Sequence, residues 1–308
     1  MRIDLIYLVL LTQLICCCNP SKSKTTKAQL FHIRSAEIAG YPSGSTITFY
    51  KGNLYLMGDD ARTLLVLNEM LDIQDAITLF PGSDVRVNKT EKADIESSEW
   101  IDNKLYLFGS GSMSSVRDSG FVFDPESQKS LRLELGPFYH RIRENGIEDL
   151  NLEGATLVKD HLVLANRRNL GNRDNYLIVN PLERLLQTIS KVVKLNLPGY
   201  AGVSGLTYLP KHDLLILTAS EEETSSTYDD GAIGESYLGL IENFSEKLSV
   251  DEIVPDQWVQ LSKIHDDYSG QKIESVCTRK SVDGQTELLL VADNDNGTTK
   301  VFCMAMKL

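Results

Sequence analysis

The chain has 308 residues, a hydrophobic content of 42% and a net charge of -12. This composition is typical of a globular protein with a substantial core, and it excludes a disordered chain or a protein with many membrane spans. The 43 acidic residues outnumber the 31 basic ones, so the surface field repels nucleic acid and favours cations or neutral ligands. We therefore expect no nucleic-acid partner.

The N-terminal residues differ in composition from the rest of the chain. The apolar run from Leu5 to Ile15 is too short to cross a bilayer as a helix, and it has the length of a signal-peptide core. Three cysteines follow it in a pattern that resembles a bacterial lipobox, where an apolar residue stands three places before the lipid-bearing cysteine. Cys17 and Cys18 both fit this pattern. The alternatives are an ordinary signal peptide or an uncleaved N-terminal anchor.

These features predict a division of the chain into three parts. We expect a lipoprotein signal peptide in residues 1–18, a polar tether in residues 19–27 and one folded domain in residues 28–308. A lipid on Cys17 or Cys18 would hold the domain at a membrane of the bacterial cell envelope, facing the periplasm or exposed on the cell surface.

Beyond the N-terminal segment, the cysteines and histidines are few. Cys277 and Cys303 are expected on non-adjacent strands of one sheet, as two buried thiols that do not form a disulfide. The five histidines are scattered, and none has a partner at metal-ligand spacing. The sequence therefore predicts no zinc site.

A short pattern returns five times along the chain, which is typical of a repeat architecture. In each copy, a strand that begins with small or acidic residues is followed by a strand rich in Leu, Val and Tyr. The copies begin at Ser43, Ile95, Leu152, Val203 and Ile273. A repeated unit of three or four short antiparallel strands is the blade of a β-propeller, so the sequence predicts an all-β fold of this class.

The first strand of the domain lies outside this pattern. The segment Gln29–Ile38 is expected to be the outer strand of the last blade, which closes the ring through both chain ends and removes an exposed edge. Five blades are visible, and six is the alternative if residues 200–264 conceal a pair. Helical periodicity is scarce: the best candidates, Leu182–Lys194 and Leu248–Ile264, are short and interrupted.

The repeat also predicts a site. The inner strands of a propeller line its central channel, so the residues at their starts meet at one mouth. The aligned position holds Glu96, Glu153, Ser204 and Glu274, with Ser43 or Ser45 in the first blade, and the first four are expected to contact a ligand. Three carboxylates around one axis bind a cation together or raise one another's pKa, and we predict the three glutamates as ligands of Ca²⁺. The alternative is that these side chains accept backbone hydrogen bonds and hold adjacent blades in register.

Polar residues near the turns between strands extend this predicted mouth. Arg117, Asn166, Arg167 and Asp293 are expected to contact a ligand there. A mouth that carries both carboxylates and arginines is suited to a calcium ion, a phosphate group or a sugar.

Several strand starts and turns resemble one known family. They are Ile273–Ser275, Leu152–Thr156 and Val203–Leu206, with Ala165–Arg167 and Ala292–Gly297 after the second strands. They are similar to those of the esterase-like phytase propellers and of related uncharacterised bacterial lipoproteins, over roughly residues 40 to 308. The resemblance implies a five- or six-bladed propeller and a calcium-dependent phosphate-ester hydrolase.

We therefore expect a monomeric, membrane-anchored propeller that binds a small molecule or an ion at its central mouth, with phosphate-ester or related hydrolysis as the activity to test. The alternative is a non-catalytic scaffold that binds a protein or a glycan, because a propeller is also a rigid platform. Whether the protein is an enzyme stays open at this stage.

Overall fold

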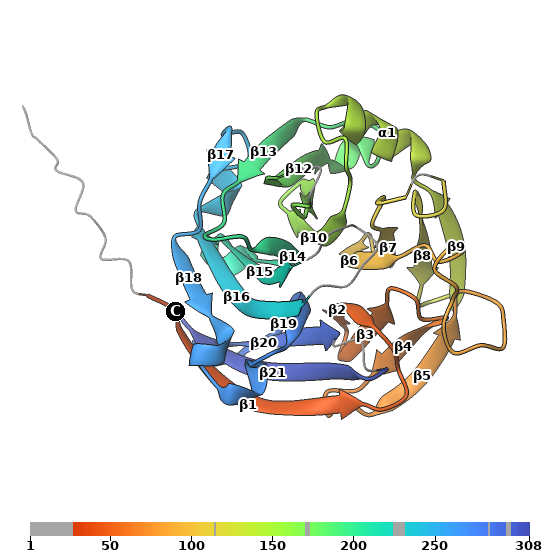
Figure 1. The fold of residues 1–308 in the computed structure, drawn as a ribbon, viewed down its shortest axis with the longest axis horizontal. Coiled ribbons are helices and arrows are strands. Elements are labelled where there is room, and N and C mark those ends of the chain that lie inside the picture. The colour runs from red at the N-terminus through yellow and green to blue at the C-terminus, as the bar shows by residue number, and fades with distance from the viewer. Residues whose placement is uncertain (1–26, 114, 170–172, 224–231, 283, 294–296) are drawn as a thin grey trace, which may run out of the picture.

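The computed structural model describes residues 27–113, 115–169, 173–223, 232–282, 284–293 and 297–308. Within these residues, five largely antiparallel sheets are arranged in a ring around a central axis (Figure 1). The five-bladed β-propeller predicted from the repeat is confirmed.

The first two blades have four strands each, in simple up-and-down order. Blade 1 contains β2 (Gly44–Tyr50), β3 (Asn53–Gly58), β4 (Thr63–Leu67) and β5 (Ile73–Thr78). Blade 2 contains β6 (Ile95–Ile101), β7 (Lys104–Gly109), β8 (Ser119–Asp124) and β9 (Lys129–Glu134). The turn between β6 and β7 consists of Asp102 and Asn103, both with positive φ, as a two-residue hairpin of the favoured handedness requires.

The next two blades share a connection. Blade 3 contains β10 (Leu152–Val158), β11 (His161–Asn166), β12 (Asn175–Pro181), β13 (Lys191–Leu195) and β17 (Glu252–Ile253). Blade 4 contains β14 (Gly202–Leu209), β15 (Leu214–Glu223), β16 (Ala232–Glu242) and β18 (Gln257–Gln260). The short β17 pairs in parallel with β13 on its way from β16 to β18. Residues 200–264 thus supply one complete blade and no second one, so the six-bladed alternative is wrong.

Blade 5 joins the two ends of the described chain. It contains β19 (Lys272–Val282), β20 (Gln285–Asp293), β21 (Thr299–Lys307) and, as its outer strand, β1 (Gln29–Ile38). The β1–β21 ladder is antiparallel and runs from Gln29 opposite Lys307 to Ile38 opposite Thr299. The predicted closure by the N-terminal strand is confirmed.

Helical structure is limited to one α-helix and several single turns among the described residues. The helix α1 (Gly136–Glu144) was not predicted; it buries Phe138, Tyr139 and Ile142 in the core cluster between blades 2 and 3. Single 3-10 turns are η1 (Leu182–Arg184), η2 (Pro210–His212), η3 (Phe244–Glu246), η4 (Leu261–Lys263) and η5 (Asp266–Tyr268). The two segments with partial helical periodicity form such turns and outer strands. No helix in the described part of the chain is long and apolar enough to cross a membrane.

The two cysteines lie as predicted. Cys277 is on β19 and Cys303 is on β21, with Leu289 of the intervening β20 opposite both. Both thiols are buried and free. They contribute to the apolar packing of blade 5.

Candidate functional site

Each inner strand of the propeller begins with the same irregularity. The ladder between first and second strand skips one residue in every blade, which is the signature of a β-bulge. The skipped residues are Ser45, Glu96, Glu153, Ser204 and Glu274. A bulge re-aims the side chain of its extra residue, so these five positions, here called the bulge ring, are structurally equivalent. The alignment of the repeats had placed the three glutamates and Ser204 at one position.

The two serines of the bulge ring link adjacent blades. The Oγ of Ser45 donates a hydrogen bond to the carbonyl of Ile95 at 2.5 Å, and the Oγ of Ser204 donates to the carbonyl of Ile273 at 2.6 Å. Each acceptor directly precedes a bulge-ring glutamate of the following blade. Both serines are buried. The two serines thus hold adjacent blades together as donors, whereas the sequence had suggested a register-holding role for the glutamates as acceptors.

The three glutamates of the bulge ring have different environments. Burial and the nearby negative charges, Glu153 foremost and Glu274 among them, raise the pKa of Glu96 well above its ordinary value. Glu153 is buried and accepts a hydrogen bond from the side-chain amide of Asn151 at 2.6 Å. Glu274 is only 5% exposed, and its Oε1 lies 2.9 Å from Lys272 Nζ. The three carboxyl groups are thus close enough for their charges to interact.

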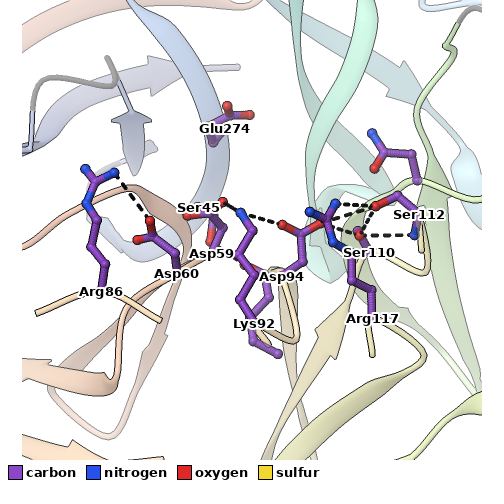
Figure 2. Close-up of polar contacts among 12 residues, drawn as sticks. Ser45, Asp59, Asp60, Arg86, Lys92, Asp94, Ser110, Ser112, Arg117 and Glu274 are labelled. Atoms are coloured by element: carbon purple, nitrogen blue, oxygen red, sulfur yellow. Dashed lines mark hydrogen bonds and ion pairs between the residues drawn. The ribbon is translucent and has the colours of Figure 1, made fainter. Parts of the chain in front are cut away.

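A buried ion network lies close enough to Glu96 for the charges of Asp94 and Asp59 to raise the pKa of that glutamate. Figure 2 shows the network around Lys92, Asp94 and Arg117. The Nζ of Lys92 lies 2.7 Å from Asp94 Oδ1 and also pairs with Asp59. An Arg117 nitrogen lies 2.7 Å from Asp94 Oδ2, and Ser110 Oγ donates to the same oxygen at 2.5 Å. Burial alone would raise the pKa of Asp94, but the two cations hold this pKa below its ordinary value. Asp94 is therefore a carboxylate.

Several carboxylate oxygens near this network lack a partner. One oxygen each from Asp59, Asp94 and Glu96 lie within 4.8 Å of one another. Asp59 Oδ1, Asp60 Oδ1 and Glu274 Oε2 are buried and accept no hydrogen bond from the protein. A buried acceptor without a donor is costly, so this arrangement suits a ligand that brings positive charge or donors. Oxygen-only ligands favour a hard cation such as Ca²⁺.

The remaining predicted ligand contacts lie on the framework of this mouth. Arg117 is buried in the ion network described above. Asn166 is fully buried, and its Oδ1 accepts a hydrogen bond from the backbone N–H of Asn151 at 2.8 Å. The guanidinium of Arg167 donates a hydrogen bond to Ser220 Oγ at 3.2 Å. Asp293 ends β20. Their contact with a ligand stays a prediction.

Lys92 and Asp94 are central to the network and were not predicted from the sequence. They lie just before Ile95, where the repeated pattern of this blade begins. Their alternation with Glu96 along the chain was the available signal. The segment is not a regular extended strand, because Asp94 has a positive φ and Glu96 is the bulge residue.

A central channel continues inward from the bulge ring. Its cavity of about 250 Å³ is lined by the inner strands of all five blades. Glu99 on β6 is part of this wall: Oε1 accepts from the backbone N–H of Trp100 at 2.7 Å, and Oε2 accepts from that of Leu157 at 3.0 Å. Burial raises the pKa of Glu99 to about 7. Glu99 therefore joins blades 2 and 3 and titrates near neutral pH.

The fold and the site define a five-bladed β-propeller with an acidic channel mouth. The chain belongs to a family of unknown function (DUF6929), whose model matches residues 40–306. No curated protein matches the chain. Since the family has no assigned activity, the resemblance to esterase-like phytases stays a prediction.

Two solved structures illustrate the fold. A glutaminyl cyclase of Myxococcus xanthus matches with a TM-score of 0.51 and 12% identity, over 90% of this chain and 96% of that one. The protein described as "Bacteroides ovatus Xyloglucan PUL GH43B" matches with a TM-score of 0.50 and 10% identity, over 89% of this chain and 54% of that one. At such identities, the likeness shows a shared fold alone.

Proposed function

We propose that the protein binds a divalent cation at its channel mouth and that Ca²⁺ is the best match. The observation that carries the proposal is the set of buried carboxylate oxygens without a hydrogen-bond partner, on Asp59, Asp60 and Glu274. Glu96 stands beside them, with a pKa raised by its acidic neighbours. A cation relieves this repulsion and supplies the missing partner to several oxygens at once.

The ion network favours one position for the cation. Asp59 and Asp94 already share the ammonium group of Lys92, so a metal ion held by both would have to displace it. On the side of Glu96 that faces Glu153 and Glu274, Lys272 engages only Oε1 of Glu274, and Oε2 of that carboxylate has no hydrogen-bond partner. We therefore assign the cation to the three glutamates of the bulge ring, with Glu274 Oε2 as one ligand atom.

Hydrolysis of a phosphate ester is proposed only for the calcium-loaded protein. Without a cation, the buried carboxylates repel a phosphate group, and the guanidinium of Arg117 is engaged with Asp94. Bound Ca²⁺ would neutralise the mouth and polarise a phosphoryl oxygen. The named enzymes of similar fold add no support for a particular substrate.

Calorimetric titration of the full-length chain with CaCl₂ tests the cation site. We expect one site in the wild type and at least a tenfold loss of affinity in Glu96→Gln and Glu274→Gln. Glu134→Gln is the matched control, because this carboxylate is exposed on the outer strand β9 and should leave binding unchanged. Equal binding in all four proteins, or none in the wild type, would overturn the proposal. A phosphomonoester assay on the same samples, with Ca²⁺ and with chelator, decides whether hydrolysis accompanies binding.

We also propose that the chain is a lipoprotein of the bacterial cell envelope. Cys17 and Cys18 lie outside the described residues, so support comes from the sequence pattern alone. Labelling of cells with an alkyne fatty acid should mark the wild-type chain and not the double variant Cys17→Ser/Cys18→Ser. The single variants then assign the lipid, and an unlabelled wild type would contradict the anchor.

A further inference from the structure

A second group of metal-binding side chains lies where the ends of the described chain meet. His32 is on β1, the strand that closes the ring, while His265 and Asp267 flank the start of η5 in the connection to blade 5. These residues are remote in sequence, which is why the spacing of the histidines gave no indication of a metal site. This group, here called the seam cluster, shares no residue with the bulge ring or the ion network.

The geometry of the seam cluster is close to that of a metal site. One ring nitrogen from each histidine and one oxygen of Asp267 lie within 4.8 Å of one another. His32 Nε2 is 3.6 Å from Asp267 Oδ2, and His265 Nδ1 is 3.6 Å from Asp267 Oδ1. Ligands about 2.1 Å from a tetrahedral zinc ion lie roughly 3.4 Å apart. Each histidine–carboxylate distance is close to this value, although the two distances involve different oxygens of Asp267.

Neighbouring side chains orient two of the three groups. The hydroxyl of Tyr268, a buried residue, lies 3.3 Å from His32 Nδ1, and in the tautomer in which Nδ1 donates this bond, the lone pair of Nε2 faces Asp267. Ser35 Oγ donates to Asp267 Oδ2 at 2.6 Å. Hydrogen bonds of this kind commonly hold the ligands of a metal site in position.

We propose that His32, His265 and Asp267 bind one Zn²⁺ ion. Two imidazoles and a carboxylate are a ligand set that zinc commonly adopts, with water in the fourth position. The stacked histidine rings, whose centroids are 4.1 Å apart, have to open around the ion. The side chain of His265 is 47% exposed, and its rotation releases the hydrogen bond that Nδ1 accepts from the backbone N–H of Asp267 at 3.2 Å.

A zinc ion at the seam cluster would link the closing strand to the connection between blades 4 and 5. At present the hydrogen bonds of Ser35 with Asp267 and of His32 with Tyr268 cross this seam, and the two histidine rings stack over it. A metal bond from β1 to both η5 ligands adds a cross-link that the unfolded chain lacks. Zinc should therefore raise the melting temperature.

Titration of the metal-free, full-length chain with ZnCl₂ against a chromophoric chelator tests the proposal, and Co²⁺ absorption reports a tetrahedral site. We expect one equivalent of Zn²⁺ in the wild type and a ten- to hundredfold weaker site in His265→Ala and Asp267→Asn. His140→Ala is the matched control, because this exposed histidine of α1 also stands next to a carboxylate, 3.3 Å from Glu144. Its binding should equal that of the wild type.

Two further comparisons keep the outcome decisive. Glu274→Gln should retain the zinc site, and its loss there would place the ion at the channel mouth and overturn the assignment. Equal affinity in the wild type, His265→Ala and Asp267→Asn would overturn it as well. Melting curves of the metal-free variants show whether either one is misfolded. If one is, the zinc affinity of the variant that remains folded decides whether the assignment holds.

Discussion

Glu99 illustrates how one side chain in the channel wall links stability to pH. Its carboxylate accepts two backbone hydrogen bonds, yet burial raises its pKa from 4.5 to about 7. A folded-state pKa above the unfolded value means that the group contributes stability below about pH 4.5, and that this contribution is lost as the pH rises through 7.

The first prediction concerns this residue. Between pH 4.5 and pH 8, ionisation of Glu99 should lower the free energy of unfolding by up to about 3 kcal/mol. Glu99→Gln should flatten this part of the pH dependence, although it loses one backbone hydrogen bond. Urea unfolding of both proteins at several pH values measures the difference. Parallel pH profiles would contradict the assignment.

A second prediction concerns Asp94, the centre of the buried ion network. Asp94→Asn leaves the ammonium of Lys92 and the guanidinium of Arg117 without their shared counter-charge, which should cost about 3–5 kcal/mol in the free energy of unfolding. Asp251→Asn is the control: its ion pair with Lys191 is exposed to solvent, so its loss should leave the free energy of unfolding almost unchanged. Equal effects in urea unfolding would show that the network is not a stabilising centre.

Secondary-structure elements approach one another closely at the end of β7. A Cβ on Gly109 would lie 2.4 Å from the carbonyl oxygen of Ser119, 2.5 Å from that of Ala93 and 2.6 Å from that of Arg117. These are backbone atoms, so they cannot move aside as a flexible side chain does. The glycine therefore lets the segments that carry Asp94 and Arg117 approach each other.

The third prediction follows from this approach. Gly109→Ala should lower the free energy of unfolding by about 1–3 kcal/mol, because three carbonyl groups have to shift. Gly136→Ala is the matched control, since nothing lies within 4 Å of its added carbon at the start of α1. Thermal melts compare the two. An unchanged melting temperature in Gly109→Ala would mean that the surrounding backbone segments can shift without loss of stability.

Some of the secondary-structure elements could be predicted from the sequence and others could not. The inner and second strands of each blade were predictable, because they are apolar and repeat. The outer strands β5 and β9 were not, since most of their side chains are exposed or half-buried. The helix α1 has only nine residues, too few for a clear period. For the site, the repeat aligned Glu96 with its equivalents, but the pairing of Lys92 and Asp94 with Arg117 arises from contacts between segments that carry no repeat.

On the scale of the whole molecule, one ladder closes the ring. β1 supplies the outer strand of blade 5. Its removal would leave β21, which carries the buried residues Phe302 and Met304, as an edge strand without a partner. An exposed strand edge is a template for pairing with other chains. Closure thus protects the protein from self-association.

The fourth prediction tests this closure. Deletion of residues 1–38 should produce oligomers in size-exclusion chromatography and lower the melting temperature. A synthetic peptide of residues 28–39 should restore the monomer by filling the vacant position in trans. A truncated chain that stays monomeric with an unchanged melting temperature would show that four blades and a three-stranded fifth suffice.

The closing ladder also fixes when the molecule can finish folding. β1 is the first described strand to leave the ribosome, whereas its partner, Thr299–Lys307, is the last described strand to be made. The ring therefore cannot close before β21 is available, and blades 1 to 4 must wait as an open arc until then. A chaperone that shields the unpaired β1 would act over this whole interval.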